Sequence, residues 1–365
     1  MQNPFTLSFG VLPEQLISRP AQKNEIIDMF REEKPSNRTY MITGVRGSGK
    51  TVMLTEIQDY FREKRDWITI ELNPEADMLR NLASGLFHAD KCHQWFINAK
   101  FNVSVLGIGF SVENEPITSD EVLIRKMLAV LEKHGIHLLI SVDEASDSPY
   151  MRQFAHAYQM FLRERHDIFL LMTGLYENIY DLQNVKTLTF LYRAPKISLT
   201  PLNFEMIAKS YYKVFGVEDK IATAMAKMTE GYPFAYQVLG FLKWENPDKS
   251  LQDISDEFDH YLAEYVYDKI WSGLTGKEKK ILTALAALIQ KKGNAQIEIK
   301  SIREETGLKT NEMSVYRDRL IRKGLVDGSN YGSLRLTLPG FDRYIKQRAL
   351  FENMTENIRN FREIR

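Results

Sequence analysis

Short, almost entirely apolar stretches recur through the first 200 residues and alternate with longer segments of helical pattern. Strands buried on both faces of a parallel sheet have this apolar character. We predict such strands at 39–43, 67–72, 137–142 and 168–174, with a fifth, shorter strand after Arg193. We predict helices at 51–65, 75–88, 119–134 and 148–165. The alternation predicts an α/β fold, a three-layer arrangement of a parallel sheet between helices.

Two segments depart from this alternation. Residues 101–113 alternate between apolar and polar at period two, which indicates a β insertion into the α/β pattern. Residues 203–268 have a helical pattern throughout, which predicts an all-helical region after the last strand.

The C-terminal part begins with a capping-box pattern, Thr275 with Glu278, which predicts the start of a helix that extends to about residue 289. Two further helices are predicted at 300–306 and 311–323. The apolar stretches 325–326 and 334–336 flank a turn-rich segment and predict a β-hairpin. Three helices followed by a hairpin resemble a winged helix-turn-helix.

Length and composition narrow the class of protein. The chain has 365 residues, enough for two or three domains, and its 44% apolar and 26% charged residues are typical of soluble globular proteins. Its apolar runs are shorter than the roughly 20 residues that cross a bilayer. The amino terminus lacks the pattern of a secretory signal, and the single cysteine, Cys92, excludes an internal disulfide framework. We therefore expect a cytoplasmic protein with no membrane partner.

Charge is unevenly distributed along the chain. The whole sequence has 48 basic and 48 acidic residues, but residues 272–365 contain 19 Lys+Arg and 11 Asp+Glu, a net charge of about +8. A basic C-terminal part behind an acidic body indicates that the two parts have different partners.

One motif carries most of the candidate chemistry. Between the first predicted strand and the next helix, the chain reads Gly44, Val45, Arg46, Gly47, Ser48, Gly49, Lys50 and Thr51. This matches the pattern G-x-x-x-x-G-K-[ST], in which glycines let successive backbone N–H groups face phosphate. Lys50 can reach the phosphate oxygens, and the Thr51 hydroxyl can ligate Mg²⁺. Because strand, loop and helix place phosphate at a helix N-terminus, we predict a site for ATP or ADP with Mg²⁺.

Polar residues end two of the predicted strands. Asp143 and Glu144 follow the apolar run at 137–142, and Thr173 lies near the end of the run at 168–174. Open α/β sheets bind ligands at the carboxyl ends of their strands. Asp143 can hold Mg²⁺ through its water shell, and Glu144 can orient or deprotonate an attacking water. Thr173 can reach the γ-phosphate or that water.

Together these motifs resemble the AAA+ and STAND branch of phosphate-loop ATPases, in particular the bacterial and archaeal ATP-binding proteins related to archaeal origin-recognition initiators. The resemblance covers about residues 5–345. It implies that Lys50 and Thr51 are Walker A residues, that Asp143 and Glu144 form the Walker B pair, and that Thr173 is the sensor-1 residue.

The resemblance implies three further site residues. Arg193 occupies the position of an arginine that acts in trans as a finger in some relatives. Arg19 resembles the arginine of an N-terminal element that contacts the base or ribose, although both neighbours of Arg19 depart from that element. Pro233 matches the proline of the G-x-P motif of STAND proteins, which abuts the nucleotide. A sensor-2 arginine is not apparent, which favours a nucleotide switch over a processive motor.

The resemblance also implies the division of the chain. The expected parts are an ATP-binding α/β domain at 1–202, a helical lid at 203–271, a winged helix at 272–348 and a C-terminal tail at 349–365.

The third C-terminal helix has two distinct sides. Met313, Tyr316 and Leu320 fall on one side and are expected to pack inward. The residues predicted to contact double-stranded DNA from the other side and from the hairpin are Asn311, Ser314, Arg319, Arg322 and Arg335. Asp318 argues against DNA because its carboxylate would face the phosphates, and winged helices also dock proteins.

We therefore expect a Mg·ATP-binding ATPase, slow in turnover, that couples nucleotide state to DNA or protein binding through the winged helix. Two alternatives stay open. One is a non-hydrolysing regulatory switch whose winged helix docks protein partners, and the other is a DNA-binding ATPase similar to replication or plasmid initiators. Self-association is open as well. The hydrolysis rate separates an enzyme from a pure switch.

Overall fold

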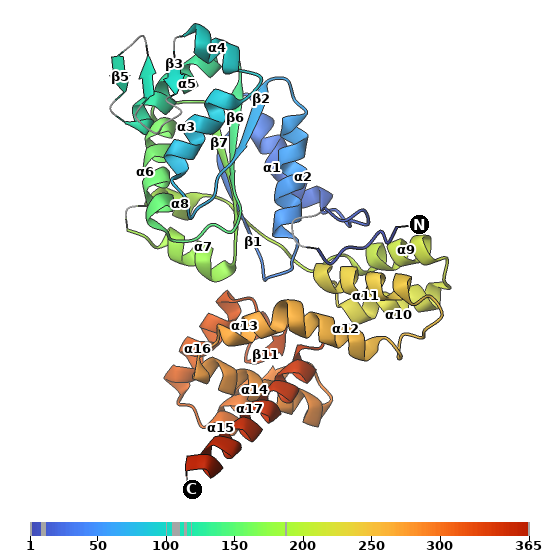
Figure 1. Ribbon diagram of the computed structural model, residues 1–365. Helices are drawn as coiled ribbons and strands as arrows, with labels where there is room; N and C mark the ends of the chain where they lie inside the picture. Colours follow the sequence, from blue (N-terminus) through green and yellow to red (C-terminus); the bar gives the residue numbers. More distant parts are fainter. Residues whose placement is uncertain are drawn as a thin grey trace. The chain divides into compact units, whose positions relative to one another are not determined.

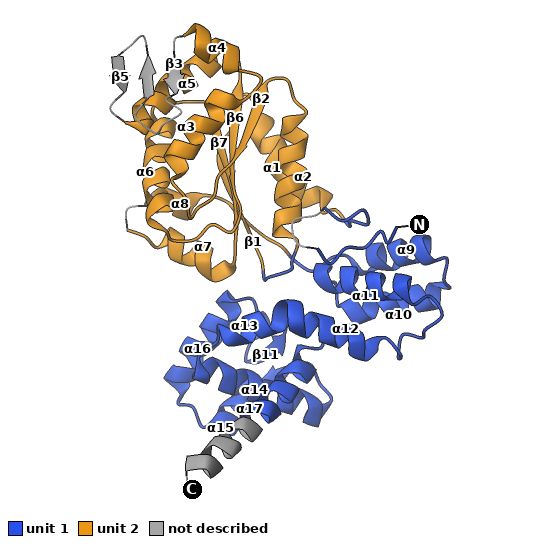
Figure 2. Ribbon diagram, in the orientation of Figure 1, with its two compact units in different colours: residues 1–17, 45–48, 200–365 blue, residues 18–44, 49–199 orange. Residues whose placement is uncertain are grey.

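The computed structural model describes residues 2–8, 12–99, 101–103, 110–112, 115–117, 119–186 and 188–363 (Figure 1). The chain forms two compact units (Figure 2). Unit 1 comprises residues 1–17, 45–48 and 200–365, and unit 2 comprises residues 18–44 and 49–199. In this described part of the chain, no helix is both long enough and apolar enough to cross a membrane.

Unit 2 is built on a five-stranded sheet with the strand order β2-β6-β7-β1-β8. All neighbouring strands in it are parallel. The strands are β1 (Thr39–Thr43), β2 (Trp67–Glu71), β6 (His137–Val142), β7 (Ile168–Gly174) and β8 (Lys196–Ser198). The predicted apolar runs and the short fifth strand are thereby confirmed.

Helices cover both faces of this sheet (Figure 1). They are α1 (Pro20–Arg31), α2 (Lys50–Arg62), α3 (Met78–His88), α4 (His93–Asn98), α5 (Asp120–Lys133), α6 (Pro149–Arg163), α7 (Tyr176–Gln183) and α8 (Thr189–Arg193). Side chains alternate along each strand, so Met41 packs in the core beneath α3, α5 and α6, whereas Tyr40 and Ile42 pack in the core beneath α1 and α2. Two cores on one sheet confirm the predicted three-layer fold.

The predicted β insertion lies between α4 and α5. Three short strands, β3 (Phe101–Val103), β4 (Phe110–Val112) and β5 (Glu115–Ile117), form an antiparallel sheet there. Residues 104–109 and 113 of the predicted insertion lie outside the described residues, and strand β5 extends the insertion to Ile117.

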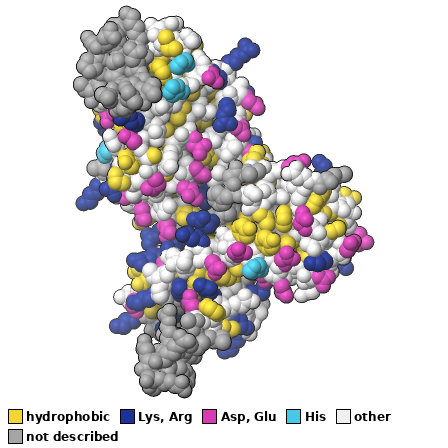
Figure 3. All heavy atoms as spheres, in the orientation of Figure 1, with side chains coloured by type: hydrophobic (Ala, Val, Ile, Leu, Met, Phe, Trp, Pro, Cys, Tyr) yellow, Lys and Arg dark blue, Asp and Glu magenta, His cyan; other side chains and the backbone are white. Residues whose placement is uncertain are grey.

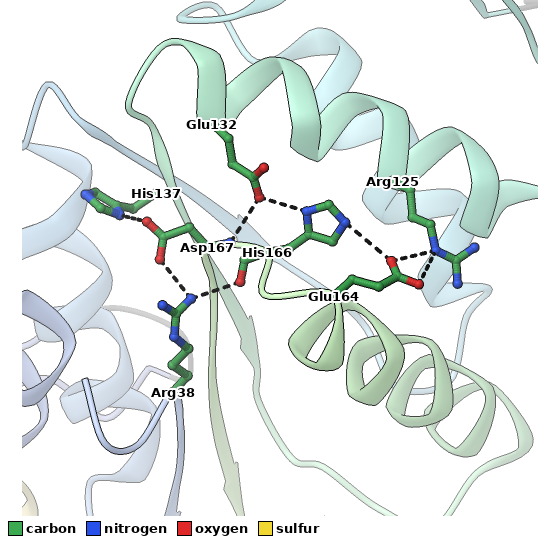
Figure 4. Close-up of polar contacts among 7 residues, drawn as sticks. All are labelled: Arg38, Arg125, Glu132, His137, Glu164, His166 and Asp167. Atoms are coloured by element: carbon green, nitrogen blue, oxygen red, sulfur yellow. Dashed lines mark hydrogen bonds and ion pairs between the residues drawn. The ribbon is translucent and has the colours of Figure 1, made fainter. Parts of the chain in front are cut away.

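A polar network ties the amino-terminal ends of three strands together (Figure 4). Asp167, directly before β7, accepts hydrogen bonds from the His137 ring at the start of β6 and from Arg38 Nη1, 2.9 Å away, directly before β1. Arg38 also donates to the carbonyl oxygen of His166 at 2.9 Å. The His166 ring lies 2.7 Å from the Glu132 carboxylate of α5. These contacts fix the edge of the sheet that lies opposite the predicted nucleotide site.

We predict that unit 2 becomes less stable as the pH rises through the pKa of His137. The hydrogen bond to Asp167 raises that pKa above 6.5 against the effect of burial, and the charges of Asp167 and Asp66 raise it while Arg38 lowers it. A pKa raised on folding stabilises the fold fully below the unfolded value, and this contribution is lost above the folded value. Because the His137 side chain is 35% exposed, we expect less than about 1 kcal/mol.

Urea unfolding at about pH 6 and about pH 8.5 tests this expectation, because the two conditions bracket the titration. His137→Gln should remove the pH-dependent part of the loss, whereas His156→Gln, at an exposed position on α6, should retain it. Equal pH dependence in wild type and His137→Gln would contradict the assignment.

Residues 1–17 pack in unit 1, although the sequence places them in the predicted domain at 1–202. Phe5 is 2% exposed, and its ring stacks on Phe215 with centroids 5.7 Å apart. A Cβ atom at Gly240 would lie 2.4 Å from the Phe5 ring, so only glycine leaves room for it. The Gln237 side chain donates a hydrogen bond of 2.7 Å to the Gln15 carbonyl. The segment thus completes the core of the lid helices.

Unit 1 continues with the helices predicted for the lid. They are α9 (Phe204–Phe215), α10 (Asp219–Thr229), α11 (Pro233–Glu245), α12 (Ser255–Leu262), the π-helix η1 (Ala263–Tyr267) and α13 (Asp268–Ser272). One hydrophobic core extends from these helices into the C-terminal elements. The lid helices and the C-terminal elements are therefore parts of one packed body.

The C-terminal elements occur in the predicted order. They are α14 (Gly276–Lys292), β9 (Ile297–Glu298), α15 (Ile299–Thr306), α16 (Thr310–Arg322), β10 (Val326–Asp327), β11 (Ser333–Leu336) and α17 (Phe341–Glu363). The predicted capping box is present, because Thr275 N–H donates to the Glu278 carboxylate at 2.8 Å and Glu278 N–H donates back to the Thr275 hydroxyl at 3.4 Å. Strand β9 adds a third strand to the predicted hairpin.

Candidate nucleotide site

The glycine-rich loop connects β1 to α2, as its sequence requires. Gly47 and Gly49 have φ of +74° and +88°, a left-handed backbone that favours glycine. Lys50 Nζ donates a hydrogen bond of 3.1 Å to the Gly44 carbonyl, which closes the loop on itself. Ser48 is 4% exposed, and among the residues that the structure describes its hydroxyl has no hydrogen-bond partner. A buried hydroxyl without a partner is costly unless a ligand satisfies it.

The predicted Walker B residues lie beside the start of α2. Thr51 Oγ1 donates a hydrogen bond of 2.7 Å to Asp143 Oδ2. The other carboxylate oxygen accepts hydrogen bonds from the Thr173 hydroxyl and from the Glu144 backbone N–H, the latter at 3.0 Å. Strand β7 lies between β1 and β6 in the sheet, so the carboxyl ends of the three strands bring these side chains together.

Thr173 forms a hydrogen bond with the predicted Walker B residue Asp143. It is fully buried, its hydroxyl donates to Asp143, and it accepts a hydrogen bond of 3.2 Å from Glu144 N–H. In this arrangement Thr173 orients the Asp143 carboxylate. The predicted reach of Thr173 to the γ-phosphate or to water stays a prediction.

Glu144 has an unusual backbone. Its φ is +53°, the left-handed region that side-chain-bearing residues seldom adopt, and its side chain is exposed. The Ala145 N–H donates a hydrogen bond of 2.7 Å to the Thr173 carbonyl, so the neighbouring strand fixes the turn. Strained residues of this kind cluster at functional sites. The turn leaves the carboxylate of Glu144 accessible at the sheet edge.

Arg19 lies against the phosphate-binding loop. It caps α1, and its Nη1 would be 3.5 Å from a Cβ atom at Gly49. Burial lowers the pKa of the Arg19 guanidinium, and the nearby Glu56 carboxylate counteracts that effect. Glu56 also accepts hydrogen bonds from Ser18 at 2.9 Å and from Lys23 at 2.8 Å. Arg19 is thus held next to the loop rather than extended into solvent.

Arg193 is not brought to the site of its own chain. It is the exposed last residue of α8 and precedes the amino-terminal end of β8, which pairs with β1 from Met41 onward. The predicted Walker residues follow the carboxyl ends of the strands instead. Any contact of Arg193 with a nucleotide would therefore involve a second copy of the chain.

Pro233 is the first residue of α11. The preceding residue, Tyr232, was not singled out from the sequence as part of the site. Tyr232 is buried, and its hydroxyl donates a hydrogen bond of 2.6 Å to the carbonyl of Arg46, at the apex of the phosphate-binding loop. The sequence signal for it was its middle position in the G-x-P pattern.

The surface predicted to contact DNA, on α16 and the hairpin, carries both basic and acidic side chains. The inward side of α16 is as predicted for Met313 and Leu320, which are buried, and Val315 on the outward side is 50% exposed. The basic side chains have neighbours: Arg335 pairs with Asp327 at 3.2 Å, and Arg319 lies over the Tyr316 ring. Lys and Arg side chains lie among Asp and Glu side chains over these elements (Figure 3).

Known structures with a similar fold include that of an archaeal protein. The Aeropyrum pernix ORC2 protein, solved in ADPNP–ADP complexes, matches with a TM-score of 0.58 and 14% identity over 94% of this chain and 97% of that chain. The chain has an AAA+-type fold. Cdc6p from Pyrobaculum aerophilum matches with a TM-score of 0.45 and 15% identity over 95% of this chain and 97% of that chain.

Comparison at the level of sequence identifies one family model, which covers the C-terminal part of the chain. A family model described as a domain of unknown function, DUF8462, matches residues 264–345. No curated protein sequence matches the chain. The matched residues span η1 to the start of α17, the region predicted to be a winged helix.

Proposed function

We propose that the protein is a Mg·ATP-binding ATPase that couples nucleotide state to DNA or protein binding through its C-terminal module. The observation that carries the proposal is the hydrogen bond of 2.7 Å between Thr51 Oγ1 and Asp143 Oδ2. A hydroxyl and a carboxylate, side by side after a glycine-rich loop, are the oxygen donors that Mg²⁺ prefers. The Ser48 hydroxyl, which has no hydrogen-bond partner in the described part of the chain, adds a further group that a phosphate would satisfy.

The chain's own residues account for phosphoryl transfer to water. Thr51 and Asp143 would hold Mg²⁺, which would supply neutralisation of the negative charge on the phosphates. Backbone N–H groups of the loop and Lys50 would bind the β- and γ-phosphates and stabilise the charge that builds up during transfer. Thr173 keeps the Asp143 carboxylate oriented through its hydrogen bond. The exposed carboxylate of Glu144 would position a water for in-line attack and accept its proton.

Lys50→Ala tests the site, and we predict that it removes most ATP affinity while the protein stays folded. Lys50 is 9% exposed, and its Nζ donates a hydrogen bond to the Gly44 carbonyl of the loop, so we expect its loss to remove phosphate contacts and leave the sheet intact. A charge-assisted contact of about 2–3 kcal/mol corresponds to a loss of about two orders of magnitude in affinity. The measurement is titration with a fluorescent ATP analogue, together with melting curves.

The matched control is Lys126→Ala, at an exposed lysine on α5 of the same unit. It should bind the analogue as wild type does. If wild type and Lys50→Ala bound the ATP analogue with equal affinity, the assignment of the nucleotide site would be contradicted.

The finer role of the C-terminal module has two candidates. DNA binding would use the residues predicted on α16 and β11, namely Asn311, Ser314, Arg319, Arg322 and Arg335. Protein docking, as in a non-hydrolysing switch, is favoured by the ion pair of Arg335 with Asp327 and by the exposed Tyr331 at the hairpin tip. A mobility shift of a duplex-DNA probe that weakens with rising salt separates the two.

A further inference from the structure

The apex of the phosphate-binding loop packs against the lid segment before α11. Tyr232 Oη donates a hydrogen bond of 2.6 Å to the carbonyl oxygen of Arg46. A Cβ atom at Gly47 would lie 2.3 Å from that hydroxyl oxygen and 3.0 Å from Cβ of Phe234. Loop apex and lid belong to the same unit (Figure 2), so this contact is part of one packed body.

Tyr232 is a fixed hydrogen-bond donor. It is 5% exposed, and burial raises the pKa of its hydroxyl, so the group stays protonated. Two left-handed residues in succession, Glu230 with φ of +47° and Gly231 with φ of +77°, turn the chain toward the loop. The Gly231 carbonyl accepts a hydrogen bond of 2.7 Å from Leu202 N–H, which anchors this turn to the lid.

The hydrogen bond acts on a peptide group that the proposed site uses. The Arg46 carbonyl and the Gly47 N–H are two ends of one peptide group. A hydrogen bond to the carbonyl polarises the group and makes its N–H a stronger donor. Backbone N–H groups of such loops are the ones that bind phosphate. Tyr232 therefore fixes the loop backbone and strengthens one of its phosphate donors.

The same lid region is tied to the C-terminal elements. Tyr267 of η1 is buried, its hydroxyl donates a hydrogen bond of 2.6 Å to the Pro339 carbonyl, and its ring centroid lies 4.9 Å from that of Phe341 in α17. Asp259 of α12 forms a two-pronged ion pair with Arg343 of α17, with both N–O distances 2.7 Å.

Tyr232 and Tyr267 share one neighbourhood. Both belong to the same buried core. Burial foremost, followed by the electrostatic influence of Tyr232, Asp259 and Glu230, raises the pKa of Tyr267. The hydrophobic core that contains Tyr232 thus extends through Tyr267 to Phe341 of α17.

We propose that Tyr232 is a positioning residue that couples the phosphate-binding loop to the C-terminal module. This inference rests on the proposed function of the nucleotide site. Phosphate bound at the loop would fix the peptide group to which Tyr232 is bonded, and the shared core would pass that order to α12, η1 and α17. Because one hydrogen bond contributes about 1 kcal/mol, we expect the loss of this one to change nucleotide affinity by about fivefold to tenfold.

The test compares Tyr232→Phe with Tyr211→Phe in the full chain. Tyr211 is a matched control because it is fully buried in the same unit and donates a hydrogen bond of 2.8 Å to the backbone carbonyl of Tyr236. Amide hydrogen exchange of residues 45–49, measured without nucleotide, should be about fivefold to tenfold faster in Tyr232→Phe alone. Affinity for fluorescent ADP should fall by a similar factor in that variant alone.

A second readout follows the signal to the C-terminal module. Saturating ADPNP should slow amide exchange at 339–345 in wild type and in Tyr211→Phe. In Tyr232→Phe, at saturation, this protection should be smaller. If Tyr232 had a purely structural role, saturating ADPNP would protect residues 339–345 to the same extent in Tyr232→Phe and in wild type.

A double-mutant cycle tests direct contact between the loop and Tyr232. Gly47→Ala introduces a Cβ atom that clashes with the Tyr232 hydroxyl, besides the backbone strain of an alanine at positive φ. The strain is the same in both backgrounds and cancels in the cycle. Gly47→Ala should therefore weaken ADP binding less in the Tyr232→Phe background than in wild type. Additive effects would overturn the contact.

The outcomes of these experiments separate the proposal from the function on which it rests. Faster exchange at 45–49 with weaker ADP binding in Tyr232→Phe alone supports the proposal. Wild-type exchange and affinity in that variant overturn it and leave the nucleotide site intact. If wild type and Lys50→Ala bind nucleotide equally, the proposed function fails. The exchange result, which needs no nucleotide, still decides whether Tyr232 holds the loop.

Discussion

Glu144→Gln is expected to bind Mg·ATP close to wild-type affinity and to hydrolyse it at least about 10²-fold more slowly. The amide keeps the size of the side chain but loses the basicity and charge that activate water. The backbone of Glu144 is held by hydrogen bonds of its N–H to Asp143 and Thr173, which the substitution does not touch. Phosphate release measures turnover, and titration with a fluorescent ATP analogue measures binding.

Asp147→Asn is the matched control for this experiment. Asp147 is an exposed carboxylate in the same loop after β6, and it pairs with Arg152 at 2.5 Å. Its neutralisation should leave turnover at the wild-type rate. If Glu144→Gln also hydrolyses at that rate, Glu144 only ends its strand. If wild type shows no turnover at all, the non-hydrolysing switch becomes the better account.

The sheet and its phosphate-binding loop are features that local sequence determines. Strands buried on both faces must be apolar along their whole length, so the runs at β1, β6 and β7 were predictable. The loop was predictable because its glycines and Lys50 follow one another directly. Both signals come from residues adjacent in the chain, and no knowledge of distant contacts is needed to interpret them.

The missed features all depend on contacts between residues far apart in the chain. Phe5 is close in sequence to α1, yet it completes the core around Tyr211 and Tyr236, more than 200 residues away. The contact of Tyr232 with Arg46 joins the lid to the loop across a similar separation. The left-handed backbone of Glu144 depends on Thr173 in the next strand of the sheet. Composition and periodicity carry no information about such pairs.

Arg193→Ala is expected to abolish a concentration-dependent part of the ATPase activity while ATP binding is unchanged. Arg193 is exposed and lies away from the carboxyl edge of its own sheet, so a role in hydrolysis would require the site of another copy. Its neighbour Tyr192 is 69% exposed, which gives this surface an apolar component suited to contact. Trans-acting arginines contribute about 10³-fold or more to the rate of phosphoryl transfer. Activity per protomer should therefore rise with protein concentration in wild type.

The control for this experiment is Arg163→Ala, at an exposed arginine that ends α6 in the same unit. This variant should retain the rise in activity per protomer with concentration. Sedimentation at the same concentrations tells whether Arg193→Ala acts on assembly or on chemistry, because a finger variant should still associate. A rate that does not depend on concentration, and that Arg193→Ala leaves unchanged, would show that the side chain has no part in hydrolysis. The active form would then be the single chain, with Lys50 and the loop N–H groups supplying the charge stabilisation.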